Sequence, residues 1–131
     1  MTFSLARFAP YFLSLLRIAT AIVFIPHGTQ KLFYVPNAPH PPLPMFSQIW
    51  FAGVLEVFGG GLMLLGLFSR PVAFLLAGEM AVAYVQEHAP HGWLPILNEG
   101  ELAVLCCFIW LYISAAGPGP WSLDAIVRRR H

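Results

Sequence analysis

Ionisable side chains recur inside the apolar stretches of this chain. The candidates are Arg17, His27 and Lys31 in the first stretch, Glu56 in the second, Glu79 in the third and Glu101 in the fourth. A charged side chain near the centre of a bilayer costs about 2.5–3.5 kcal/mol on insertion scales, so such groups usually face the protein interior and have partners. Carboxyl and imidazole groups also transfer protons. The pattern predicts buried polar sites.

One group of these residues is expected to converge in the outer half of the membrane. Helix direction and a rise of about 1.5 Å per residue place Glu56 near mid-membrane and Glu101 about one turn below the outer boundary. We predict a cavity that opens to the outer side and is formed by His27, Lys31, Glu56 and Glu101, with His88 at its rim. The expected catalytic, proton-transferring groups are His27, Glu56 and Glu101.

A glycine face accompanies Glu56. Gly53, Glu56 and Gly60 follow the i, i+3, i+7 spacing of one helix face, so a neighbouring helix or a flat ligand can approach closely there. We predict that Gly53, Gly60, Lys31 and His88 contact a bound substrate or quinone.

Arg17 and Glu79 lie at matched depth, roughly 10–12 Å from the same membrane surface. We predict a structural ion pair between them, in which each charge offsets the desolvation of the other. A di-iron centre is not expected, because the Glu-x-x-His pairs of di-iron bundles are absent from the sequence. A single metal ion on His27, Glu56 and Glu101 is a less favoured alternative, and a haem on His27 or His88 is less favoured still. The adjacent Cys106 and Cys107 indicate ordinary packing.

The composition places these groups in a membrane protein. Of 131 residues, 58% are hydrophobic and 10% are charged, against roughly 45–50% and about 25% in soluble domains. So short a chain cannot bury that apolar surface in water. A net charge of +1 gives no broad field for nucleic acid.

Four segments are long enough to cross the bilayer, at about 10–33, 47–68, 71–86 and 96–116. Proline-containing loops follow the first and third segments, whereas only Ser69 and Arg70 separate the second from the third. We predict an all-α, antiparallel four-helix membrane bundle that forms a single domain over residues 1–131. Arg7, Arg70 and the arginines at 128–130 share one side, which predicts that both termini are cytoplasmic.

Five motifs together resemble the DoxX family of small bacterial inner-membrane proteins. They are "HGTQKLF" (27–33), "GLFSRPVA" (66–73), "GEMAVAY" (78–84), "NEGELAVL" (98–105) and "AAGPGPWSLD" (115–124). The resemblance implies a four-helix membrane bundle and a link to redox chemistry. In this family a DoxD/DoxA pair acts as a thiosulfate:quinone oxidoreductase, and other members associate with sulfur-transfer and oxidative-stress proteins.

The recurrent polar positions of the family match a set of residues here. They are His27, Gly28, Lys31, Glu56, Arg70, Pro71, Glu79, and Asn98 with Glu101. The resemblance thus adds Asn98 to the expected binding residues. Glu99 departs from the small residue usual after that asparagine.

Three functions follow as hypotheses. The first is a quinone-interacting subunit of a membrane oxidoreductase, with quinone as the cofactor and a redox partner that supplies further chemistry. The second is a small transporter or proton relay that uses the buried acids. The third is a non-catalytic anchor for a soluble redox enzyme, with Arg70 and the arginines at 128–130 as partner contacts. A homo-oligomer is compatible with each.

Overall fold

The computed structural model describes residues 4–37 and 44–129, and in these ranges the chain is helical with no strand. The all-α prediction is therefore confirmed for the described residues. The elements in chain order are η1 (Leu5–Phe8), α1 (Ala9–Phe33), α2 (Gln48–Leu65), α3 (Ser69–Ala83), η2 (Tyr84–His88), η3 (Ala89–His91), α4 (Pro95–Asn98), α5 (Glu101–Ala116) and α6 (Leu123–Arg129).

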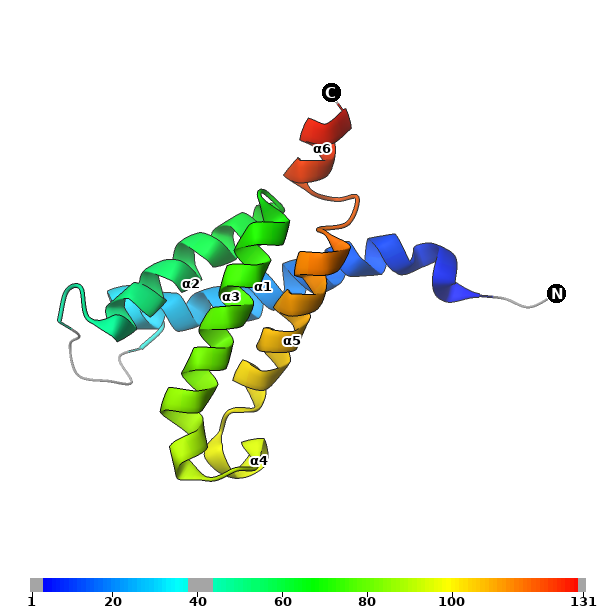
Figure 1. Ribbon diagram of the computed structural model, residues 1–131. Coiled ribbons are helices and arrows are strands. Elements are labelled where there is room, and N and C mark those ends of the chain that lie inside the picture. The colour runs from blue at the N-terminus through cyan, green and yellow to red at the C-terminus, as the bar shows by residue number, and fades with distance from the viewer. Residues whose placement is uncertain (1–3, 38–43, 130–131) are drawn as a thin grey trace.

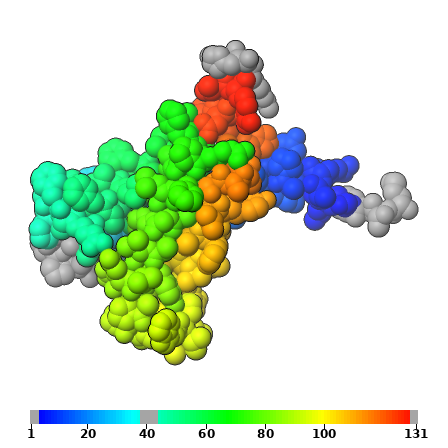
Figure 2. Space-filling model, viewed as in Figure 1, coloured from blue at the N-terminus to red at the C-terminus, as the bar shows by residue number. Residues whose placement is uncertain are grey.

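The long helices form two antiparallel pairs that cross one another. α1 packs along α2, and α3 packs along α5. In Figure 1 the first pair runs across the second instead of lying parallel to it. Figure 2 shows the far ends of α3 and α5, in yellow-green and yellow, projecting as an arm beyond the α1–α2 pair. α2 and α3, although they follow each other directly in the sequence, cross instead of packing along each other. Polar groups of the two pairs meet at this crossing.

The second and third helices are shorter than the sequence predicted. α2 ends at Leu65, not 68, because Gly66 takes a left-handed conformation (φ 73°) and its amide caps the carbonyls of the last turn. α3 ends at Ala83, not 86, and continues through a π-turn, Tyr84–His88, into a 3₁₀ turn. π-turns inside helices are frequent at functional sites.

The predicted helix 96–116 is interrupted, which is a correction. Glu99 adopts a left-handed conformation (φ 59°) and separates α4 from α5. The Asn98 side chain accepts a hydrogen bond from the Gly100 amide at 2.9 Å. A side chain at Gly100 would lie 2.7 Å from the Tyr84 ring. A local cap and a tight contact with the neighbouring helix therefore outweigh the apolar pattern.

The core lies between the two helix pairs. Phe24 of α1 and Trp110 of α5 are almost fully buried and meet edge to face, with ring centroids 5.6 Å apart. Met63 and Leu76 complete this contact from α2 and α3. Many large apolar side chains instead point outward on α1, α2 and α5, among them Leu15, Phe58, Leu105 and Phe108. An outer surface of this kind suits lipid better than water.

Two helical runs, Leu5–Phe33 and Gln48–Leu65, are long and apolar enough to cross a membrane. α5 is apolar but has only 16 residues.

Candidate functional site

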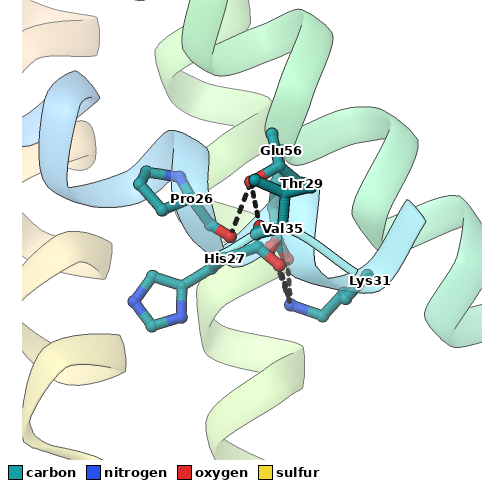
Figure 3. Close-up of polar contacts among 6 residues, drawn as sticks. All are labelled: Pro26, His27, Thr29, Lys31, Val35 and Glu56. Atoms are coloured by element: carbon teal, nitrogen blue, oxygen red, sulfur yellow. Dashed lines mark hydrogen bonds and ion pairs between the residues drawn. The ribbon is translucent and has the colours of Figure 1, made fainter. Parts of the chain in front are cut away.

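An ion pair joins α1 to α2 in the interior. Lys31 Nζ lies 2.7 Å from Glu56 Oε1 and 3.1 Å from Oε2. Figure 3 shows the ammonium reaching the carboxylate from the last turn of α1. The Glu56 side chain is 1% exposed and that of Lys31 is 25% exposed. A carboxylate removed from solvent needs such a counter-charge, because its desolvation is otherwise uncompensated.

Two glycines allow α1 and α2 to pack closely at this ion pair. A Cβ added at Gly28 would lie 2.9 Å from Glu56 Cβ, and one added at Gly53 would lie 2.9 Å from Lys31 Cβ. Each helix therefore presents a glycine opposite the charged residue of the other. The backbones approach closely enough for a short, direct ion pair because neither glycine has a side chain.

Glu79 of α3 completes a cluster with Glu56 and Lys31. Its carboxyl group lies close enough to the Glu56 carboxyl group and to the Lys31 ammonium group to interact with both electrostatically. Glu79 Oε1 is buried and has no hydrogen-bond partner within the described residues. The cluster thus brings two carboxyl groups and one ammonium group together, and one carboxyl oxygen has no partner among the described residues.

A cavity of about 840 Å³ adjoins the cluster. Its walls are mostly apolar and come from α1, α2, α3 and α5, with Phe24, Leu55, Phe74 and Leu102 among them. Lys31, Glu56 and Glu79 line it together with His27. Small-molecule sites have this character, with volumes of roughly 300–1,000 Å³ and a few polar groups on an apolar surface.

The rim of the cavity is polar. Gln48 Nε2 of α2 donates to Gln86 Oε1 at 2.7 Å, which links α2 to the π-turn. Glu87, His88 and Glu99 also line the cavity at this end. His88 Nδ1 lies 3.0 Å from the Asn98 carbonyl oxygen. The π-turn therefore directs three consecutive polar side chains, at 86–88, toward the cavity.

His27 is exposed and lines the cavity, but its ring points away from the ion pair (Figure 3). Only its backbone oxygen approaches Lys31 Nζ, at 3.5 Å.

Several predicted site residues lie elsewhere. Glu101 is exposed in the first turn of α5 and does not line the cavity, because the break at Glu99 and Gly100 sets the start of α5. Asn98 is buried, and its side chain is occupied by Tyr84, Gly92 and Gly100 in the 84–100 turn. It stabilises the rim and does not face the cavity.

The glycine face on α2 is covered by α1, so no ligand can lie there. A Cβ at Gly53 would meet Lys31 and Leu32, and one at Gly60 would lie 2.6 Å from Ile25 Cγ1. The predicted ligand contacts of Gly53 and Gly60 are therefore wrong. The neighbouring helix takes the space.

The predicted Arg17–Glu79 ion pair is also wrong. Arg17 is 1% exposed, and its guanidinium donates to three backbone carbonyls, those of Met63 (2.8 Å), Pro118 and Trp121 (2.7 Å). The segment after α5 folds back over α1 and supplies two of these acceptors. The matched-depth argument failed, because the α1–α2 and α3–α5 pairs cross, and Glu79 lies near Lys31 in the last turn of α1, far along the helix from Arg17.

Arg70 also binds backbone. Its Nη1 donates to the carbonyl of Ala115 at the end of α5, where a cation suits the helix dipole. The side chain remains exposed, and its partner-binding role stays a prediction.

Among the described residues, no three His, Cys, Asp or Glu side chains come together as a metal-binding group. Glu101 is separated from His27 and Glu56, so the metal set considered from the sequence is not assembled. Both cysteines are free thiols, and Cys106 is buried in the core.

Comparison with known proteins places the chain in a family. The DoxX family model matches residues 12–89. The chain belongs to the DoxX family. It is 41% identical to an uncharacterized protein of Haemophilus influenzae, over 92% of this chain and 94% of that one. It is 30% identical to an uncharacterized membrane protein of Mycobacterium tuberculosis, over 88% of this chain and 80% of that one. No solved structure matches.

Family membership, composition and the two candidate spans together support a membrane protein. The matched region of this DoxX chain contains Lys31, Glu56 and Glu79. Sequence reasoning missed the contact between the two glutamates. It also missed the rim residues Gln48, Gln86 and Glu87, although polar residues flanking His88 were a usable signal.

Proposed function

We propose that this DoxX-family protein is a quinone-interacting subunit of a membrane oxidoreductase. The observation that carries the proposal is the apolar cavity of about 840 Å³ with the Lys31–Glu56–Glu79 cluster in its wall. A quinone has a flat ring that suits apolar walls and two oxygens that need hydrogen-bond donors. Its reduction to the quinol consumes two electrons and two protons.

The cluster is suited to the proton part of that reaction. Glu56 and Glu79 both line the cavity, and a carboxyl group can carry a proton to a quinone oxygen. Lys31 stabilises the carboxylate that remains after transfer, and it is partly exposed at the cavity. His27 and His88 line the same cavity and can return protons to the acids. The two electrons come from a redox partner subunit.

The proposal includes the membrane arrangement. The protein crosses a bacterial inner membrane four times, through α1, α2, α3 with its π-turn extension, and α5, and both termini are cytoplasmic. The location of Arg7, Arg70 and Arg128 at helix ends remote from the cavity rim supports this orientation. Reporter fusions or cysteine accessibility at the 44–47 loop and at α6 test it.

The test of quinone binding uses the full chain purified in mild detergent. Organic extracts are analysed by mass spectrometry, and the protein is then titrated with a short-chain quinone. We expect near-stoichiometric quinone in the wild type and at least a tenfold loss of affinity in Glu56→Gln, Glu79→Gln and His27→Ala. Glu101→Gln is the matched control, because it removes a carboxylate outside the cavity.

Wild-type protein that neither retains nor binds a quinone refutes the proposal. An equal loss of affinity in Glu101→Gln also contradicts it, because the effect then does not come from the cavity. Glu79→Gln guards against a folding artefact, since it leaves the Lys31–Glu56 ion pair in place, and thermal unfolding of each variant checks its integrity.

A proton relay is the second candidate. It is favoured by Glu79 Oε1, which is buried, lies beside the Glu56 carboxyl group and has no hydrogen-bond partner in the described residues. Proton flux into liposomes in the absence of quinone, abolished by Glu79→Gln, supports the relay. Flux that is absent from wild-type protein excludes it.

A further inference from the structure

A second cavity lies at the opposite end of the protein from the proposed quinone site. Its volume is about 640 Å³, and it is enclosed by the start of α1, the end of α5 and the segment that leads into α6. Two arginines line it, Arg70 and Arg128, together with Tyr112 and the apolar Leu13 and Ala116. No residue of this cavity is shared with the first one.

This end of the molecule carries an excess of positive charge. Arg17, Arg70 and Arg128 lie here, and Asp124 is the acid beside them. The five other acids of the chain, at 56, 79, 87, 99 and 101, belong to the other cavity or to the turn near it. Asp124 is already engaged, because its carboxylate accepts hydrogen bonds from the amides of Phe68 (2.9 Å) and Ser69 (2.8 Å).

The two lining arginines are held in place by the fold. Arg70 donates one N–H to Ala115, and its Nη2 lies 3.0 Å from the position that a Cβ on Gly117 would take. The guanidinium therefore rests against a backbone without a side chain. Because it has five N–H donors, several remain for a ligand. Arg128 is positioned by α6, whose first turn is tied to the α2–α3 connection by the Asp124 amide and the Gly66 carbonyl at 2.9 Å.

Aromatic side chains at this end indicate the level of the lipid headgroups. The rings of Tyr11 and Trp121 contact each other in a tilted arrangement with centroids 5.4 Å apart, and Tyr112 lines the cavity itself. Tyrosine and tryptophan concentrate at membrane–water interfaces. Basic pockets between membrane helices on the cytoplasmic side suit anionic headgroups.

We propose that this cavity binds the phosphate headgroup of an anionic phospholipid, with Arg70 and Arg128 as the phosphate ligands. The planar guanidinium groups donate paired hydrogen bonds to phosphate oxygens. The acyl chains lie over Leu13 and the neighbouring apolar surface of α1. The site is independent of the quinone proposal, since it uses other residues at the other end of the helices.

The test is native mass spectrometry of the full-length protein in mild detergent, titrated with phosphatidylglycerol, phosphatidylcholine or inorganic phosphate. We expect phosphatidylglycerol to bind about tenfold more tightly than phosphatidylcholine. Arg128→Gln and Arg70→Gln should each lower the affinity for phosphatidylglycerol about tenfold. The matched control is Arg7→Gln, which removes a charge at the same end but outside the cavity lining. It should change affinity less than twofold.

Each alternative result overturns the proposal. Equal binding of the two lipids removes the role of the headgroup charge. An equal loss in Arg7→Gln shows a general charge effect without a site. Inorganic phosphate that competes at the concentration of the lipid assigns the cavity to a free anion. Arg128 contacts solvent on α6, so its variant should fold even if Arg70→Gln weakens the end of α5, and thermal unfolding verifies this.

Discussion

The close approach of α1 and α2 makes Gly28→Ala a sharp test of the site's architecture. A methyl group at position 28 would lie 2.8 Å from Val57 Cγ2, 2.9 Å from Glu56 Cβ and 2.9 Å from the Gly53 carbonyl oxygen. Two of these atoms belong to the backbone or to a Cβ and cannot rotate away. The helices must therefore separate, and Lys31 moves away from Glu56.

The magnitude follows from two opposing effects. Overpacking a tight contact costs about 3 kcal/mol at the upper end of its usual range, which applies because the blocking atoms are rigid. Replacing glycine by alanine in a helix returns about 1 kcal/mol. We expect Gly28→Ala to lose about 2 kcal/mol of unfolding free energy. Gly61→Ala is the control, because a Cβ at Gly61 meets nothing within 4 Å, and it should gain up to about 1 kcal/mol.

The assay is reversible unfolding of both variants in mixed detergent micelles, monitored by circular dichroism. The two glycines lie on adjacent, paired helices, so the same assay reports on both. If Gly28→Ala is as stable as Gly61→Ala, α1 and α2 do not approach as closely as described. The glycines then do not explain the short Lys31–Glu56 ion pair.

Three further predictions concern charged groups. Lys31→Met should cost about 3 kcal/mol, because it leaves the buried Glu56 without a counter-charge, and adding Glu56→Gln should recover much of that loss in the same unfolding assay. Arg17→Gln should release the segment after α5, because this segment loses its hydrogen bonds to the guanidinium. Limited proteolysis should then cut the segment at least tenfold faster than in the wild type. An unchanged cleavage rate would contradict the role assigned to Arg17. Burial by itself raises the pKa of Asp124, but the hydrogen bonds from Ser69 and Phe68 and the charge of Arg128 outweigh it and hold that pKa below its usual value. A carboxyl group whose pKa is lowered by folding stabilises the protein above its unfolded pKa, and this contribution disappears as pH falls through the folded pKa. The wild type should therefore lose its stability advantage over Asp124→Asn below about pH 4, as measured by thermal unfolding across pH.

Much of the helical layout followed from local sequence. The prolines between 35 and 44 and the apolar run before them predicted the end of α1, which the structure places at Phe33. Composition and the resemblance predicted a membrane protein of the DoxX family, which the comparisons support. Such features depend on neighbours within a few residues, so a single sequence contains them.

Helix ends that depend on polar caps were harder to predict from the sequence. The Asn98–Gly100 contact interrupts an apolar run that reads as one helix from 96 to 116. A hydropathy pattern does not distinguish a continuous helix from one that is broken by a single left-handed residue such as Glu99. Gly100 also lies tightly against the Tyr84 ring, a contact that depends on the path of the preceding turn.

The sequence alone determined that ionisable side chains recur within its apolar segments. The tertiary structure decided which groups meet: Arg17 binds the carbonyls of Met63, Pro118 and Trp121, while Glu79 turns to Glu56. The position of a side chain along its own helix follows from the rise per residue. Partner choice depends on how each helix is rotated and which helix it packs against. Those are properties of the assembled chain, set here by glycines that admit α1 against α2 and by a terminal segment that folds back over Arg17.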